Sequence, residues 1–378
     1  MYSRVGVFLS PVHETGQDPH LAIRRNLDLV DLLDELNFDE AWFGEHHSLG
    51  WGLVGAPETM IAAASQRTRQ IKLAHGVVPL SSHHPFHVAS RAIHLDHLTR
   101  GRYILGVGPG VPFDAPMLGL DPGIQRTRLS EALPTVLELV NGESRVTDKT
   151  DWYQLTDAKV QLPRFTPSGI ELAMATSGTS MTSPKLAGRY GMSMVSFALP
   201  FALMTPGSPQ HIDLGRQWGY AEESAAEHGN TMHRENWRIA LPVHVAETRK
   251  EALDDVREGY DRWLFEYFGK AAGREVLSPD VPRSKMLEAR IEAGGALVGS
   301  PDDVVNDIRR MHERTGGFGS LLVYVADWTT WEKTNRSMQL LARHVAPQIT
   351  GAARRPQEAV DWAIASRERR LQAAATSS

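Results

Sequence analysis

The feature that most constrains the fold is an alternation, repeated eight times, of a short apolar run with a longer stretch of helical period. The runs are rich in Val, Ile, Leu and Phe, which is typical of strands buried in a parallel sheet. Eight βα units favour one α/β domain, a (β/α)8 TIM barrel, because an open doubly wound sheet usually has fewer strands. The expected strands are Arg4–Leu9, Glu40–Phe43, Ile71–Val78, Tyr103–Val107, Glu171–Ala175, Met192–Phe197, Ile239–Val245 and Leu321–Val325.

The stretches between these runs carry the signals of helices. Asp18 followed by Pro19 is typical of a helix start, and Leu29, Leu32 and Leu33 then belong to one apolar stripe. The expected helices are Pro19–Leu36, Pro57–Gln66, Pro85–Leu98, Arg126–Asn141, Pro184–Tyr190, Pro209–Glu227, Arg249–Phe268, Pro301–Thr315 and Trp331–Val345.

Two segments interrupt the alternation and are expected as insertions after the fourth and seventh βα units. Residues 143–170 include the alternating Val160-Gln161-Leu162 and predict a small hairpin, whereas residues 269–295 are charged and contain Gly. We therefore expect one barrel domain over residues 1–350. The Ala- and Arg-rich tail, residues 351–378, is expected as a loose helix packed on the outside of the barrel or on a partner.

Composition excludes several classes of function. Lys and Arg number 40 against 45 Asp and Glu, a net charge of −5 without long runs of one sign, so nucleic acid and anionic membranes are not expected partners. The chain has no Cys, which excludes disulfides, thiolate metal sites and a cysteine nucleophile. The first ten residues lack the apolar core of a signal peptide, and no run of about 18 apolar residues could span a membrane. We expect a cytoplasmic protein with a small, neutral ligand.

Histidines gather where two of the expected strands end, which is where a TIM barrel carries its active site. Glu45, His46 and His47 follow the second strand, and His83 and His84 follow the third. A carboxylate beside two histidines suits proton transfer, metal ligation or stacking under a cofactor, although a buried hydrogen-bonded histidine pair would leave the same pattern. We expect no metal, because the strand-end His-x-His pair and the late Asp of barrel metal sites are missing.

Two further strand ends favour a flat, phosphorylated cofactor. Gly106, Gly108 and Gly110 end the fourth strand and would let a ring approach the backbone, while Pro109 excludes the helix that a dinucleotide fingerprint requires. The hydroxyl-rich segment 176–183 follows the fifth strand, directly before an expected helix. A helix N-terminus with such hydroxyls can bind a phosphate, although a capped surface loop would have the same composition.

These motifs, taken together, resemble one known family. Glu45-His46-His47, residues 80–85 and residues 98–108 are similar in order and spacing to the bacterial luciferase-like flavin monooxygenases. The similarity is greatest to the branch that includes luciferase α-subunits, limonene monooxygenase and diketocamphane monooxygenases. It covers about Arg4 to Ile349, and late segments such as Asp327-Trp328 agree with it. The family fold is a TIM barrel, as the strand count also predicts.

The resemblance implies a two-component FMN-dependent monooxygenase. A separate NAD(P)H:flavin reductase would supply reduced FMN, which reacts with O2 to give a flavin C4a-peroxide. The peroxide would oxygenate a lipophilic small molecule by epoxidation, hydroxylation or Baeyer–Villiger insertion. The family also leads us to expect a homodimer. Two alternatives stay open: a deazaflavin-dependent hydride-transfer oxidoreductase on the same barrel, and a non-catalytic flavin-binding protein.

The resemblance also assigns roles to residues. His46 matches the catalytic histidine, Gly108 lies beside flavin C4a, and Gly76-Val77 matches a position where the family often has a cis peptide against the isoalloxazine. Luciferase, one member of the family, has an arginine at the position where this chain has Pro109, so light emission is not expected. The expected cofactor-binding residues are Glu45, Gly76, Val77, His84, Gly108, Thr176, Ser177 and Ser183. The residues expected to line an apolar substrate pocket, some of which could instead be packing, are Trp51, Phe197, Phe201 and Trp328.

Overall fold

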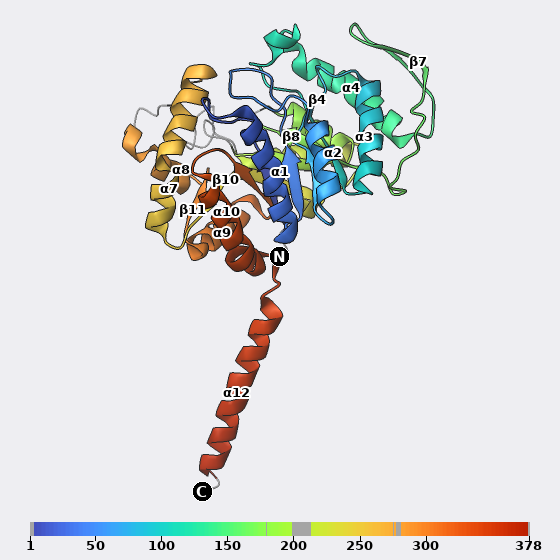
Figure 1. Ribbon diagram of the computed structural model, residues 1–378. Helices are drawn as coiled ribbons and strands as arrows, with labels where there is room; N and C mark the ends of the chain where they lie inside the picture. Colours follow the sequence, from blue (N-terminus) through green and yellow to red (C-terminus); the bar gives the residue numbers. More distant parts are fainter. Residues whose placement is uncertain (1–3, 179, 199–212, 275, 277–280, 377–378) are drawn as a thin grey trace.

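Eight parallel strands close into a barrel with helices around it (Figure 1), which confirms the predicted (β/α)8 fold. The barrel closes because β12 pairs in parallel with β1. The structure is a computed structural model that describes residues 4–178, 180–198, 213–274, 276 and 281–376. In order around the barrel, the strands are β1 (Arg4–Leu9), β2 (Glu40–Phe43), β3 (Lys72–His75), β5 (Tyr103–Gly108), β8 (Glu171–Thr176), β9 (Ser193–Phe197), β10 (Trp237–Val245) and β12 (Ser320–Val325).

The third expected strand, Ile71–Val78, is interrupted in the structure. β3 ends at His75, the peptide bond Gly76–Val77 is cis, and the chain then pairs again with β5 through the short β4 (Val78–Pro79). The apolar run predicted one continuous strand because hydrophobic periodicity does not show where a strand is interrupted within such a run.

Helices follow the strands and cover the outside of the barrel. As expected, Asp18 accepts a hydrogen bond from the backbone N–H of His20, with Pro19 as the first helical residue. The expected start at Pro184 is wrong, because that helix begins at Thr182, and residues 209–212 of another expected helix lie outside the described residues. The helices are α1 (Pro19–Glu35), α2 (Pro57–Arg67), α3 (Pro85–Thr99), α4 (Gln125–Asn141), α5 (Thr182–Arg189), α6 (Leu214–Glu227), α7 (Arg249–Asp261) and α10 (Trp331–Leu340).

Smaller elements join these units. Two helices continue as π-helical segments, α7 over Arg262–Ala271 and α10 over Leu341–Val345. Short 3-10 helices are Ala115–Leu118, Pro122–Ile124, Arg234–Asn236 and Arg283–Lys285.

Additional elements lie in the two segments that interrupt the alternation. Between α4 and β8, β6 (Val146–Lys149) and β7 (Gln154–Ala158) form an antiparallel hairpin that ends before the alternating residues 160–162. Between α7 and β12, the structure adds α8 (Met286–Glu292), β11 (Leu297–Gly299) and α9 (Pro301–Thr315). β11 pairs with β10 beside the barrel, and the sequence did not predict it.

The tail forms a helix that stands away from the barrel. After α11 (Ala346–Thr350), α12 (Arg354–Thr376) extends outward on the side where the N-terminus lies (Figure 1). Its side chains are exposed along almost its whole length. Packing on the outside of the barrel is therefore wrong for this helix, and packing on a partner stays a prediction. No helix in the described ranges is both long and apolar enough to cross a membrane.

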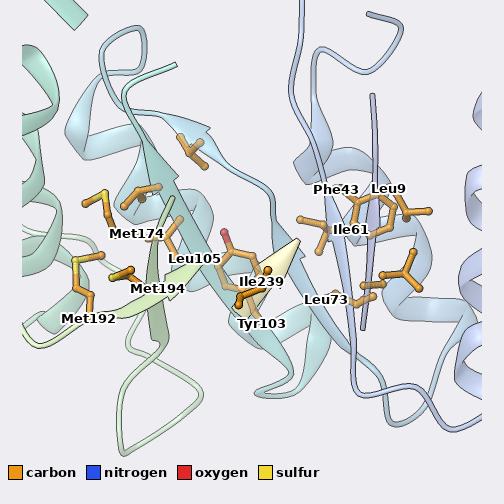
Figure 2. Close-up of a cluster of buried hydrophobic side chains, with 14 of the residues drawn as sticks. Leu9, Phe43, Ile61, Leu73, Tyr103, Leu105, Met174, Met192, Met194 and Ile239 are labelled. Atoms are coloured by element: carbon orange, nitrogen blue, oxygen red, sulfur yellow. The ribbon is translucent and has the colours of Figure 1, made fainter. Parts of the chain in front are cut away.

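Two apolar clusters hold the fold together. The outer cluster packs between the strands and the surrounding helices, and Figure 2 shows Leu9, Phe43, Leu73, Leu105, Met174, Met194 and Ile239 from successive strands within it. The inner cluster fills the barrel toward the carboxyl ends of the strands and continues under α7 and α8. Its central aromatic residues, called the inner aromatic cluster below, are Phe8, Phe197, Tyr260, Trp263, Tyr324 and Trp328.

A buried ion network lies at the other end of the barrel, where the strands begin. Arg238 on β10 donates to both carboxylate oxygens of Glu40 on β2, at 2.6 Å from Nε and 2.9 Å from Nη2. Glu171 on β8 accepts from Arg238 at 2.7 Å and from Lys72 on β3 at 3.0 Å. Burial alone would raise the pKa of Glu171, but Arg238 and Lys72 lower it to about 2. The network therefore joins four strands with ionised groups.

Candidate active site

A floor of small apolar groups lies at the barrel mouth, which consists of the carboxyl ends of the strands and the loops after them. A Cβ on Gly76 would lie 2.6 Å from Cε2 of Phe8, and one on Gly108 would lie 2.9 Å from Cγ2 of Val77. Glycine thus allows Phe8 and Val77 to pack directly on these strand ends. A Cβ on Gly108 would also lie 3.4 Å from Cβ of Ala175, so small apolar groups meet at this place, where a planar ring could approach the backbone.

His46 lies in the loop after β2 and is held by Asp114, from the loop after β5. The Nδ1 of His46 and the Oδ2 of Asp114 are 2.8 Å apart. The backbone N–H of His47 and the hydroxyl of Ser48 donate to the other oxygen of Asp114. Burial would raise the pKa of Asp114, but these hydrogen bonds, that of His46 foremost, hold it below its ordinary value. An ionised Asp114 requires the proton on Nδ1, so Nε2 of His46 is the atom that can exchange a proton with a ligand.

Glu45 joins the two loops beside this pair. Its Oε1 lies 3.0 Å from Nε2 of His47 and 2.8 Å from Nε2 of His83. Burial would raise the pKa of Glu45, but the hydrogen bonds from the two histidines outweigh it and lower the pKa. The hydrogen bond to Glu45 raises the pKa of His47. Both imidazole rings use their Nε2 for the hydrogen bond to Glu45, so these nitrogen atoms are already occupied within the protein.

His84 lies directly before α3 and is the N-cap residue of this helix. Its Nδ1 accepts the backbone N–H of Phe86 at 3.3 Å, which caps the helix. Burial and the neighbouring His87 lower the pKa of His84, so the ring is neutral and carries its proton on Nε2. This N–H is the part of His84 that could donate to a cofactor.

The segment expected to hold a phosphate leads from β8 into α5. The hydroxyl of Thr176 is buried and lies 2.8 Å from Oγ of Ser196 and 3.1 Å from Oε1 of Gln217. Gln217 in turn donates to the carbonyl of Gly178 at 2.8 Å, which ties down the loop. Ser177 is exposed and Ser183 is buried in the first turn of α5. Phosphate binding by these three hydroxyls stays a prediction, and the hydroxyl of Thr176 is already bonded within the protein.

Three of the four expected substrate-pocket residues lie in the inner apolar cluster, and Phe201 lies outside the described residues. Phe197 meets Phe8 edge-on, with ring centroids 4.9 Å apart. Trp328 packs edge-on against Trp263, with centroids 5.2 Å apart. Trp51 is also buried and lies 5.6 Å from the ring of Tyr267. These residues form an apolar region next to the floor, but contact with a substrate stays a prediction.

Sequence reasoning did not find Asp114, although it is the residue that orients His46. The available signal was its place as the first acidic residue after the Gly-rich end of the fourth expected strand. In the described part of the chain, no group of three His, Asp or Glu side chains is arranged to hold a metal ion.

The sequence and the barrel fold place the chain in a known class of protein. Residues 3–317 match the family described as luciferase-like monooxygenase, and the chain belongs to this family of enzymes. It is 45% identical to 4-hydroxyprotoasukamycin monooxygenase of Streptomyces nodosus subsp. asukaensis over 98% of both chains. It is 42% identical to limonene 1,2-monooxygenase of Rhodococcus erythropolis, over 92% of this chain and 86% of that protein.

A solved structure agrees with these relatives. It is the oxygenating constituent of 3,6-diketocamphane monooxygenase from Pseudomonas putida, a type II Baeyer–Villiger monooxygenase in complex with FMN. The TM-score is 0.76 at 25% identity, and the match covers 92% of this chain and 99% of that one. The predicted family is thereby confirmed.

Proposed function

We propose that this protein is a two-component, FMN-dependent monooxygenase that oxygenates a lipophilic small molecule. A separate NAD(P)H:flavin reductase would deliver the reduced FMN, and the chain would act as a homodimer. The observation that carries the proposal is the His46–Asp114 pair, which lies at the same barrel mouth as the side-chain-poor floor. Membership of a monooxygenase family and the FMN in the diketocamphane enzyme support it.

The residues at the mouth fit a flavin. Gly76, Val77, Gly108 and Ala175 would lie against the ring, and the N-terminus of α5 with Ser177 would face the phosphate. Bound reduced FMN supplies the two electrons that activate O2. Asp114 keeps the proton of His46 on Nδ1, so Nε2 can give or take a proton at the reacting oxygen. The apolar residues around Phe197 exclude water and bind the body of the substrate.

The test is a single-turnover experiment under 18O2. Protein with reduced FMN, prepared without air, is mixed with oxygenated buffer and a panel of terpenes and cyclic ketones. We expect one 18O atom in the product of wild type. In His46→Ala, product falls by about a hundredfold and hydrogen peroxide rises in its place. His20→Ala, a change of an exposed histidine on α1, is the control and leaves the product yield unchanged.

Other results would assign the chain to another class. Binding of a reduced deazaflavin but not of reduced FMN would replace the proposal with hydride transfer. Flavin binding without product from either protein, and with reoxidation equally fast in His46→Ala, would favour a flavin carrier.

A further inference from the structure

A buried arginine that has no carboxylate partner in the described part of the chain lies among the residues of the inner aromatic cluster. Arg290 on α8 is 1% exposed, and its Nη2 donates to the carbonyl of Ala198, the residue after β9, at 3.1 Å. Among the described residues, its Nε and Nη1 have no hydrogen-bond partner. The two acidic residues two positions away along α8 are Glu288, which is engaged by Arg257 at 2.6 Å, and Glu292, which is exposed.

The guanidinium is charged and its surroundings do not neutralise it. Burial lowers the pKa of Arg290 to about 10, which leaves it protonated at neutral pH. Burial also raises the pKa values of Tyr260 and Tyr324 to about 12, so both phenols beside it are neutral. The ring of Trp263, 5.6 Å from the guanidinium carbon, offers a cation–π contact, which replaces only part of the lost hydration. An uncompensated buried cation costs several kcal/mol, so an anion would bind here favourably.

Other donors in the same cluster also lack acceptors. The indole N–H groups of Trp263 and Trp328 are buried and have no hydrogen-bond partner within the described ranges. Four of the nine unpartnered side-chain atoms found among the described residues therefore belong to Arg290 and these two tryptophans. The cluster is rich in donors and lacks acceptors for them, which is unusual because buried polar atoms are normally paired.

The position of Arg290 relates it to the proposed flavin site. Tyr324, which interacts electrostatically with Arg290, stacks on Phe8 with centroids 5.3 Å apart. Phe8 lies directly against Gly76 of the floor. The stacked rings of Tyr324 and Phe8 thus connect the surroundings of Arg290 with the surface where the flavin would lie.

We propose that Arg290 binds an anionic oxygen at one end of the substrate, a carboxylate or the ionised hydroxyl of an enol or phenol. The indole N–H groups of Trp263 and Trp328 are further donors to the same end. The proposal rests on the proposed function only in taking this region as the substrate pocket. A pure hydrocarbon would leave all of these donors unpaired, so the preferred substrate is an amphipathic acid.

The test compares ligands that differ only in the charged group. Perillic acid, perillyl alcohol and limonene share one carbon skeleton, and 2-naphthoic acid with 2-naphthalenemethanol gives a second pair. Calorimetry on the flavin-free full chain at pH 7.5 should show each acid binding at least about tenfold more tightly than its alcohol. Arg290→Met should abolish this preference and leave the alcohols within about twofold, while Arg290→Lys retains part of it.

Arg290→Met is expected to fold, because replacing an unpaired buried charge with an apolar side chain often leaves the stability of a protein unchanged or raises it. Thermal unfolding checks this: each acid should raise the Tm of wild type but not of Arg290→Met. Arg257→Met, which removes a partly exposed arginine paired with Glu288, is the matched control and keeps the preference. Equal affinities of acid and alcohol in wild type, or a preference that survives in Arg290→Met, would overturn the proposal.

The outcome is separable from that of the proposed function, because these measurements contain no flavin and no oxygen. Loss of 18O incorporation with intact acid preference would refute the monooxygenase and leave the anion site standing. Full oxygenation of neutral substrates without any acid preference would refute the anion site alone.

Discussion

Asp114 is the residue that orients the ring of His46. In Asp114→Asn, the side-chain amide can donate to Nδ1 and favour the opposite tautomer, so Nε2 would carry the proton. We expect product formation per bound FMN to fall by about tenfold to a hundredfold, with reduced FMN still bound. Asp121→Asn, a change of an exposed carboxylate that caps a 3-10 turn, is the control. Unchanged product yield in Asp114→Asn would remove this pair from the mechanism.

Glu45 should give the stability of the protein a specific pH dependence. Its pKa is held below 4.5, so its contribution is present above pH 4.5 and is lost as pH falls through the lowered value. The pKa of His47 is raised above 6.5, so its contribution is present below pH 6.5 and is lost as pH rises through the raised value. Glu45→Gln should therefore lower Tm most between pH 4.5 and 6.5, by roughly 2–4 °C. A Tm difference that does not vary with pH would show that these groups are not ionised as a pair.

Single residues were predictable where the chemistry is local in sequence. Glu45, His46 and His47 are adjacent and follow a strand, so their place at the mouth follows from the fold. Asp114 lies 68 residues after His46, and its orientation depends on how a Pro-rich loop folds back. Arg290 could not be predicted either, because its burial also depends on tertiary packing, in this case the packing of a short helix.

At the scale of elements, the close packing of β4, β5 and β8 determines how near a ring could approach the backbone at the floor. A Cβ in Gly108→Ala would lie 2.9 Å from Cγ2 of Val77, so the side chain of Val77 must shift and change the surface that the ring would meet. We expect the affinity for reduced FMN, measured by anaerobic titration, to fall at least about tenfold. In the control Gly219→Ala, on α6, the added Cβ meets nothing within 4 Å, and the protein should gain about 0.5–1 kcal/mol. Equal flavin affinity in Gly108→Ala and wild type would place the ring elsewhere.

The elements that the sequence predicted are those with strong periodic patterns. The eight strands and the helices after them were found, most within one or two residues of their observed ends. β11 was missed because Leu297–Gly299 is too short to show an alternation. The π-helical continuation of α7 was missed because its apolar pattern differs little from that of an α-helix over ten residues.

At the scale of the whole molecule, the ion network around Arg238 braces the closed barrel. Arg238→Met would leave Glu40 without its main cation and Oε1 of Glu171 without a cation, and we expect a loss of about 3–5 kcal/mol in urea unfolding. Adding Glu40→Gln and Glu171→Gln should restore most of it. Arg145→Met, which breaks an exposed ion pair with Asp157, should cost about 0–1 kcal/mol. A loss below 1 kcal/mol in Arg238→Met would show that the brace is dispensable.

The position of α12 has a practical consequence. The helix leaves the barrel on the side of the N-terminus, and the loops that carry His46 and Asp114 lie at the opposite end (Figure 1). A solid support, an electrode tether or a genetically fused reductase attached behind this helix would be held away from the mouth. In immobilised molecules the barrel mouth would then face the solution, and the 23 helical residues of α12 would act as a spacer.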